Sequence, residues 1–483
     1  MASLKKNIVY SSLLTISGYL FPLLTFPYVT RVLGVNNIGI CNFVDSIVHY
    51  FIIFSMMGVT TVGIREVAKT KSNREELSKT YSSLIVLNLL FTFTAIGMLF
   101  LCTLFVSKLQ CYSEMFYIGA AKILANSLLI EWLYKGLENF RYITVRTVVV
   151  RSIYVLSVFL FVKEADDYDI YFFLTTMMFV VNAVVNVAYS RNFVDFSLRN
   201  ISFSPYIKPY IVLGVYMILT NLYTTFNVMY LGFATDETQV GYYTTATKLY
   251  AIIMSFFSAF TGVMMPRMSS LLSEGKFEDF RRLTTKSVEA LMAFAMPMIL
   301  ISEICAPQII TFIAGTGYEG SIMPMRIVMP LMLIIGYEQI IILQMLTPMK
   351  KDSAIFANSI IGASVGVLFN ILLVSRFGST GTAIVWVVSE ISVLISAQFF
   401  VTKYIGYKMP ILAFIKRLFL AIPIIGVCWL VNQSISGTLS SLFIVAAFAS
   451  VCWLLVESLI LKNRIIIDNL KHVISVPLKS GRS

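Results

Sequence analysis

Several basic side chains lie inside stretches that are otherwise apolar, where a charge is costly. Four of them fall well within such stretches and a fifth closes one: Lys122, Arg151, Lys248 and Arg326, and then Arg31. Ionisable groups within membrane spans are expensive and are therefore candidates for function. Such cations could line a cavity that receives an anionic molecule, and the planar donors of arginine suit phosphate in particular. The alternative is that each cation forms an ion pair that holds two helices together.

Two carboxylates and a histidine lie at similar depth. Asp45 and His49 are four residues apart and therefore share one face of a helix. This pair could take up a proton or a sodium ion, because histidine titrates near neutrality. Asp45 could equally be the partner of Arg31 or Lys122. Glu390 has no cation near it in the sequence, so it must find one in space or be protonated. Asp45, His49 and Glu390 are the candidates for ion coupling.

These side chains belong to fourteen apolar stretches, each near the roughly 20 residues that a helix needs to cross a hydrocarbon core. The predicted spans cover residues 8–29, 40–63, 81–106, 114–134, 143–162, 169–190, 210–234, 240–264, 286–314, 322–346, 353–375, 380–402, 412–432 and 438–462. Of the 483 residues, 58% are hydrophobic and only 13% are charged, which excludes an ordinary soluble domain. The sequence therefore predicts an all-α integral membrane protein with about 14 transmembrane helices.

Positive charge is concentrated on alternate loops. Loops on the side of the N-terminus hold most of the 37 Lys and Arg residues, and the opposite loops hold Arg31, Lys108, Lys163 and Arg376. Because cytoplasmic loops carry the excess of Lys and Arg, this pattern predicts that both termini are cytoplasmic. Orientation and contact with anionic membrane lipid account for the net charge of +12, so we do not expect nucleic acid as a partner.

An internal repeat suggests two related halves. Gly39 and Arg65 flank one span, Gly241 and Arg267 flank another, and each pair is 26 residues apart. Related halves around a central cavity are the usual architecture of secondary transporters. The alternative is chance similarity around a common turn signal. We predict three parts: a six-helix half over residues 1–209, a second six-helix half over 210–409, and two extra helices with a basic cytoplasmic tail over 410–483.

The loops leave little room for other functions. The predicted outer loops are only a few residues long, so the chain has no outer segment large enough for a catalytic domain. No GxxxxGK[ST] sequence is present to bind a nucleoside triphosphate. The six cysteines lack the spacing of a metal or redox site. We therefore expect a transporter rather than an enzyme, and we expect no cofactor.

Several segments resemble signatures of a known family. These are FPYVTRVLG at residues 26–34, EWLYKGLENFRYI at 131–143, YLG at 230–232, VGYYTTATKL at 240–249 and PRMS at 266–269. They resemble the bacterial polysaccharide exporters, including O-antigen repeat-unit flippases, of the multidrug/oligosaccharidyl-lipid/polysaccharide flippase superfamily. The resemblance covers nearly the whole chain, and the last third matches mainly in its pattern of spans.

The resemblance implies a function. It implies translocation of an undecaprenyl-pyrophosphate-linked oligosaccharide across the bacterial inner membrane by alternating access, for O-antigen, capsule or a related glycan. The cations Arg31, Lys122, Arg151, Lys248 and Arg326 would then line the path of the pyrophosphate or of acidic sugars. Other membrane proteins of polysaccharide assembly are possible partners. Two alternatives remain open, a flippase for the lipid-linked precursor of peptidoglycan and an ion-coupled multidrug exporter.

Overall fold

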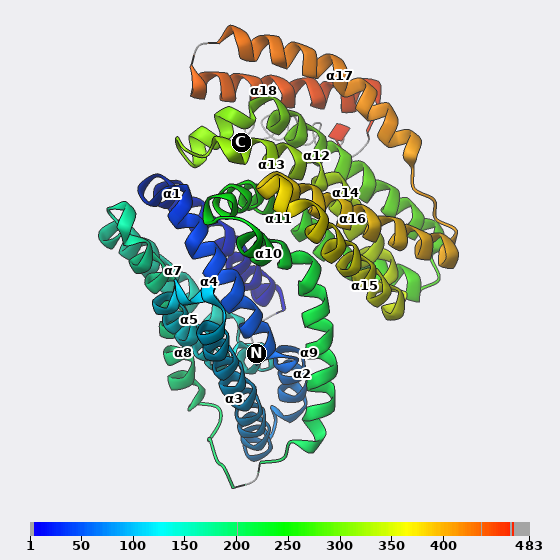
Figure 1. Ribbon diagram of the computed structural model, residues 1–483. Coiled ribbons are helices and arrows are strands. Elements are labelled where there is room, and N and C mark those ends of the chain that lie inside the picture. Colours follow the sequence, from blue (N-terminus) through cyan, green and yellow to red (C-terminus); the bar gives the residue numbers. More distant parts are fainter. Residues whose placement is uncertain (1–3, 200, 436, 464–465, 468–483) are drawn as a thin grey trace, which may run out of the picture. The chain divides into compact units, whose positions relative to one another are not determined.

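The computed structural model describes residues 4–199, 201–435, 437–463 and 466–467, and it is helical throughout, with no strand in these ranges (Figure 1). The expectation of an all-α membrane protein is confirmed. The chain forms two compact units, residues 1–244 and 245–483. The predicted division at residues 209 and 409 stays a prediction. Most of the predicted basic tail lies outside the described residues.

The first unit contains ten α-helices and the first turns of an eleventh among the residues described. They are α1 (Leu4–Met56), α2 (Val59–Thr70), α3 (Arg74–Phe105), α4 (Ser107–Gln110), α5 (Ser113–Leu128), α6 (Glu131–Gly136), α7 (Phe140–Phe161), α8 (Tyr168–Ser190), α9 (Ser204–Thr224), α10 (Phe226–Ala234) and the start of α11 (Glu237–Ser273), with a 3₁₀ turn at Ala165–Asp167.

The second unit continues α11 and contains the remaining helices. They are α12 (Phe277–Ile313), α13 (Ile322–Val328), α14 (Leu331–Ile341), α15 (Asp352–Phe369), α16 (Ser375–Ile405), α17 (Ile411–Ser434) and α18 (Thr438–Leu455). Single π-helical segments follow α14, α15 and α18 at Ile342–Leu346, Asn370–Val374 and Val456–Ile460, and a 3₁₀ turn at Glu319–Ser321 precedes α13.

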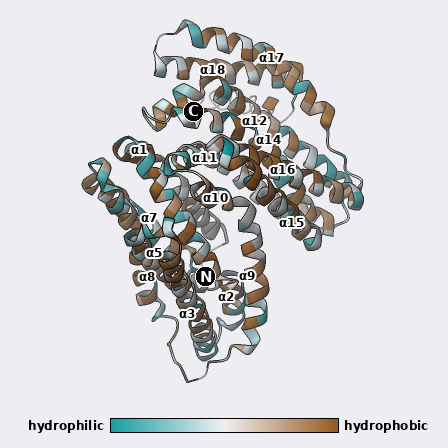
Figure 2. Ribbon diagram, viewed as in Figure 1, coloured by the Kyte–Doolittle hydropathy of each residue, from teal (hydrophilic) through white to brown (hydrophobic). Residues whose placement is uncertain are grey.

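Eleven helical segments among the described residues are long and apolar enough to cross a membrane, and Figure 2 shows hydrophobic residues along the helices. Two of the segments, Leu13–Thr70 and Asp352–Ile405, have 58 and 54 residues. Each would be about 80 Å long as an ideal helix, against a hydrocarbon core of about 30 Å. Gly34 (φ 74°) and Gly378 (φ 53°) break them with positive φ angles that glycine adopts readily. Each segment can therefore supply two spans, and the number fourteen stays a prediction.

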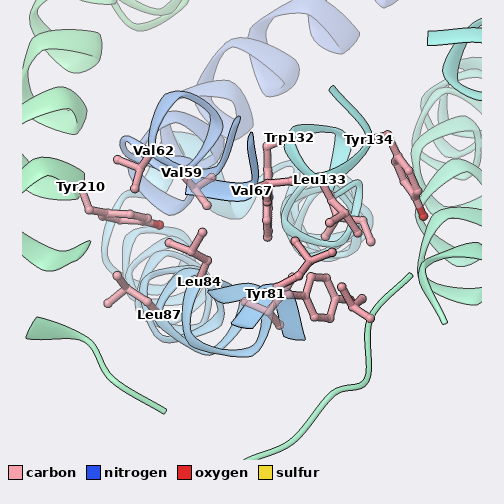
Figure 3. Close-up of a cluster of buried hydrophobic side chains, with 14 of the residues drawn as sticks. Val59, Val62, Val67, Tyr81, Leu84, Leu87, Trp132, Leu133, Tyr134 and Tyr210 are labelled. Carbon is pink, nitrogen blue, oxygen red and sulfur yellow. The ribbon is translucent and has the colours of Figure 1, made fainter. Parts of the chain in front are cut away.

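The first unit has its own apolar core, shown in Figure 3. Side chains of α2, α3, α6 and α9 meet there: Val59, Val62, Val67, Tyr81, Leu84, Leu87, Trp132, Leu133, Tyr134 and Tyr210. Trp132 packs against Gly63 so closely that a Cβ atom there would lie 2.6 Å from the ring. The motif at residues 131–136 is therefore largely a packing element, and it fixes the short helix α6 against α2.

Backbones approach closely at two glycines of the first unit, Gly39 and Gly241, which flank spans of the predicted repeat. A Cβ atom on Gly39 of α1 would lie 1.7 Å from the carbonyl oxygen of Glu237, at the start of α11. A Cβ atom on Gly241 would lie 2.2 Å from the carbonyl oxygen of Val35. Only hydrogen fits at either position, so both glycines are required by the helix crossing.

The second unit attaches its last two helices through apolar and ionic contacts. Cys305 of α12, Cys428 of α17 and Trp453 of α18 belong to one buried cluster. At one edge, Arg417 donates two hydrogen bonds to Glu457, with distances of 2.7 Å from Nε and 3.1 Å from Nη2. Both side chains are buried, and such paired, hydrogen-bonded geometry is what a buried ion pair requires.

Candidate functional site

Lys122 is the most deeply buried of the predicted cations. It lies on α5, its side chain is 8% exposed, and its ammonium group forms an ion pair with Asp45 of α1. The ammonium also lies over two rings of α8, 5.8 Å from the centroid of Phe172 and 5.1 Å from that of Phe179. These rings favour the cation electrostatically. The pairing matches one of the alternatives that the sequence left open for Asp45.

The two partners differ in their surroundings. The Asp45 side chain is 47% exposed, whereas that of Lys122 is nearly covered. His49 lies one turn further along α1, is exposed, and forms a side-chain hydrogen bond with Asn221 of α9. A half-exposed carboxylate can exchange its partner more easily than a buried one can. The site therefore holds a shielded cation whose counter-ion is accessible.

A second charged cluster forms around Glu131, at the start of α6. Ile130 precedes it with φ 40° and ψ 31°, a left-handed conformation that is rare for a β-branched residue. This break ends α5 and starts a new helix. Glu131 accepts hydrogen bonds from Lys135 Nζ at 3.1 Å and from Arg146 Nη2 of α7 at 2.9 Å. One carboxylate is thus shared by two cations.

Arg151 lies one and a half turns beyond Arg146 on α7. Its Nη1 donates a hydrogen bond to Ser17 Oγ of α1 at 2.6 Å and a longer one to the Leu14 carbonyl at 3.4 Å. It is half-buried, and its charged neighbours are Glu131 and Arg146. Arg151 therefore belongs to the Glu131 cluster, in which the basic side chains outnumber the carboxylate.

The remaining predicted cations have varied surroundings. Arg31 is exposed and donates to the Pro27 carbonyl at 2.6 Å, within its own helix. Arg326 of α13 is half-buried and its Nε donates to the Glu303 carbonyl at 3.1 Å. Lys248 is half-buried on α11. Lys248 and Arg326 lie in the second unit, and the other three lie in the first.

The neighbour of the Glu390 carboxyl group is another carboxyl group. Glu390 of α16 and Glu338 of α14 are 4% and 8% exposed and lie within hydrogen-bonding reach of each other. Trp386 Nε1 donates to Glu390 Oε1 at 2.9 Å. Neither carboxyl group has a Lys or Arg within ion-pair distance in the described part of the chain. The buried hydroxyl of Tyr250, with its ring 5.1 Å from that of Trp386, completes the group.

Glu131, Arg146 and Glu338 were not predicted as site residues. Arg146 lies just inside the predicted span 143–162 and was counted with the basic residues of the cytoplasmic side. Glu338 lies inside the predicted span 322–346. The sequence separation of 52 residues from Glu390 gave no signal of their contact, because helix packing alone brings them together.

Comparison with known proteins adds independent information. The family profile described as "Polysaccharide biosynthesis protein" matches residues 4–272, more than half of the chain. A candidate O-antigen transporter of Escherichia coli (strain K12) is 25% identical over 395 residues, covering 80% of this chain and 94% of that protein. One from Shigella dysenteriae is 24% identical over 400 residues, covering 81% and 98%.

Solved structures show the same fold. The lipid II flippase MurJ in an inward closed conformation has a TM-score of 0.78 at 14% identity, covering 95% of this chain and 99% of that one. An inward-facing multidrug resistance MATE family transporter of the MOP superfamily has a TM-score of 0.66 at 13% identity, covering 79% and 95%. At these identities the likeness establishes the fold and leaves the transported molecule open.

Proposed function

The chain belongs to the polysaccharide biosynthesis protein family, and from this premise we propose that it is a flippase. It moves an oligosaccharide linked to undecaprenyl pyrophosphate from the cytoplasmic to the periplasmic leaflet of the bacterial inner membrane. Both termini are cytoplasmic in this proposal, in line with the distribution of basic loops. In this proposal the glycan serves O-antigen, which the descriptions of the two relatives name, or capsule or a related polysaccharide.

The observation that carries this proposal is the position of the buried cations. Lys122, Arg146 and Arg151 all lie within the segment that matches the family, on helices long enough to span a membrane. A pyrophosphate and its sugars cannot cross hydrocarbon unaided, because isolated charges in an apolar medium are very costly. Cations held inside the membrane domain reduce that cost.

The geometry at Lys122 suggests how the anion is received. Asp45 neutralises Lys122 in the absence of substrate, and its exposed side lets an anion compete for the ammonium group. Arg31, Arg151, Lys248 and Arg326 are proposed as further contacts along the path, as the resemblance implies. Alternating access then transfers the head group without passing it through lipid.

Ion coupling is proposed at the carboxyl pair of the second unit. Two carboxyl groups in contact, with no cation beside them in the described residues, hold a proton between them most favourably. Release and uptake of that proton would couple transport to a proton gradient. Asp45 and His49 are a second possible coupling site, in competition with the role of Asp45 as the partner of Lys122.

Complementation tests the proposal. The gene is expressed in a bacterium that lacks its own O-antigen flippase but makes a matched lipid-linked repeat unit, and surface glycan is measured. We expect restored glycan from the unmodified protein and loss of most of it with Lys122→Ala or Arg151→Ala. Arg199→Ala, which removes one exposed charge from the loop between α8 and α9, is the matched control and should retain activity.

Two results would contradict the proposal. One is full export by the Lys122→Ala and Arg151→Ala variants, which would refute the cationic path. The other is accumulation of substrate inside the cell although the protein is inserted and several repeat-unit structures have been tried. In that case rescue of a strain depleted of its peptidoglycan-precursor flippase would show the alternative function.

A further inference from the structure

An open groove on the first unit lies between α7 and α8, and one of its lining residues is Arg146 of the Glu131 cluster. Its volume is about 590 Å³. Its lining combines an aliphatic strip with basic and aromatic side chains: Asn139, Arg141, Tyr142, Val145, Arg146, Val149, Val150, Val185 and Tyr189. The strip is exposed, since Val145 and Val149 are 52% and 51% accessible. The groove thus has an apolar part that faces outward and a cationic part.

Arg146 is the unusual residue in this groove. It is only 7% exposed, yet its Nε and Nη1 have no hydrogen-bond partner among the described residues. Only Nη2 is satisfied, by Glu131 and by Thr147 Oγ1 at 2.7 Å. A buried donor that is left unpaired costs about 1–3 kcal/mol, and more when it is charged. Arg146 lines the groove and holds two unsatisfied guanidinium donors beside it, which favours a ligand with acceptor oxygens.

The charge balance around Arg146 also favours an anion. Glu131 is shared between Arg146 and Lys135, and Arg151 is a further nearby cation. Arg141, exposed at the same end of the groove, forms no ion pair in the described part of the chain. The cluster therefore carries excess positive charge that its own carboxylate does not neutralise.

The wall beside Arg146 is fixed in place. The rings of Tyr142 and Tyr189 stack with centroids 3.9 Å apart, and the Arg146 guanidinium lies 5.9 Å from the centroid of Tyr142. Tyr142 Oη donates to Asn186 Oδ1 at 3.0 Å, and Tyr134 Oη donates to the Asn186 carbonyl. These contacts join α6, α7 and α8, so the groove is preorganised rather than a gap between mobile side chains.

We propose that this groove binds the phosphate head group of a membrane lipid, with Arg146 and Arg141 on the phosphate and the hydrocarbon chain along Val145, Val149 and Val185. Arg146 lies about 9 Å from the start of α7, at 1.5 Å per residue, a depth at which a head group and the first part of a chain can both be reached. Basic pockets between membrane helices are known binding sites for anionic lipid head groups. The proposal does not rest on oligosaccharide transport, because a polyprenyl phosphate and an ordinary phospholipid share this chemistry.

Lipid binding to the purified full-length protein tests the proposal. Native mass spectrometry or a titration in detergent would use four probes separately: undecaprenyl phosphate, phosphatidylglycerol, diacylglycerol and inorganic phosphate. We expect the phosphate-headed lipids to bind and Arg146→Gln to weaken them by about tenfold, as expected for lost charge-assisted hydrogen bonds. Arg146→Lys should recover part of the affinity. Arg199→Gln, which removes an exposed charge outside the groove, should change nothing.

Two further variants make the result independent of folding effects at Arg146. Arg141→Gln removes an exposed cation that has no ion-pair partner among the described residues, and it should weaken the same lipids by about threefold. Val149→Trp fills the apolar part without changing charge, and it should weaken the lipids but not inorganic phosphate. Unfolding temperatures measured on each variant show whether the protein remains intact.

The outcomes separate the sources of the ligand. Preference for undecaprenyl phosphate supports the site and assigns it to the substrate lipid or its product, and equal binding of phosphatidylglycerol supports it as a general phospholipid site. Equal binding of inorganic phosphate, unaffected by Val149→Trp, would overturn the lipid assignment. Unchanged lipid binding in Arg146→Gln and Arg141→Gln, or equal binding of diacylglycerol, would overturn the whole proposal.

Discussion

In residues 1–244, the buried cations Lys122 and Arg146 each face a carboxylate, whereas in residues 245–483 two buried carboxyl groups, Glu338 and Glu390, face each other. The first arrangement keeps charge inside the membrane domain by compensating it. We propose that the second avoids charge by holding a proton between two acids. In the proposed function, the two units would therefore receive different ligands, an anion in the first and a proton in the second.

The largest loss of stability is expected when the carboxylate beside Lys122 is removed. Asp45→Ala leaves a nearly covered ammonium group without its counter-ion. We expect a loss of about 2 kcal/mol in stability, less than for a fully buried pair because Asp45 is half exposed to water. Thermal unfolding of the detergent-purified protein measures this loss.

The double variant Asp45→Ala, Lys122→Met is the control. It replaces the pair with apolar groups and should recover most of the lost stability, since a buried pair can often be replaced in this way. If Lys122 contacts the substrate, the double variant should not export glycan even though its stability is recovered. Recovery of both stability and export would mean that the pair is only structural.

A smaller effect is expected at the carboxyl pair. Raising the pH until the proton between Glu338 and Glu390 is lost would leave two like charges in contact, and this should lower the unfolding temperature of the unmodified protein. Glu390→Gln keeps a neutral hydrogen-bonding partner and should reduce this dependence by about 1 kcal/mol. Glu390→Gln should also make export insensitive to the proton gradient.

The control for the carboxyl pair is Glu303→Gln, which changes a half-buried carboxyl group elsewhere in the second unit. A pH profile of Glu390→Gln that coincides with that of the unmodified protein would rule out a shared proton.

The smallest effect is expected for an ion pair at the surface. Lys71 lies 2.8 Å from Glu138 and holds the pKa of the Glu138 carboxyl below its ordinary value of 4.5. Because the folded pKa is lowered, the pair stabilises the protein above pH 4.5 and loses its effect as pH falls through the folded pKa. Glu138→Gln should leave the unfolding temperature at pH 7 nearly unchanged, as for most exposed pairs. A large decrease would show that the loop between α6 and α7 is more important than its exposure suggests.

Much of the fold could be predicted from the sequence, because hydrophobic length and loop charge act locally along the chain. The spans around Lys122 and Glu390 are of this kind. The break at Gly378 lies between two predicted spans, whereas the break at Ile130 was not predicted, because it falls inside the predicted span 114–134 and only the backbone angles reveal it.

The site was predictable only in part. Because burying a charge is costly, the sequence predicts that Lys122 and Asp45 each need a partner. Lys122 was one of the alternatives named for Asp45. Which groups meet depends on helix packing, so the contact of Glu390 with Glu338 had no signal in the sequence. Arg146 was missed because its charge fitted the pattern of basic loops so well.

The contact between Gly39 and Gly241 has a consequence for how this sequence can change over time. Each glycine lies nearest to a backbone carbonyl oxygen, so a neighbouring side chain that becomes smaller cannot make room for a larger residue at either position. A second substitution nearby therefore cannot compensate for a larger residue at either position, although such compensation is a usual route of sequence divergence. If the two glycines arose by duplication of one ancestral segment, the contact has since required glycine in both copies. The residues around each glycine remained free to diverge.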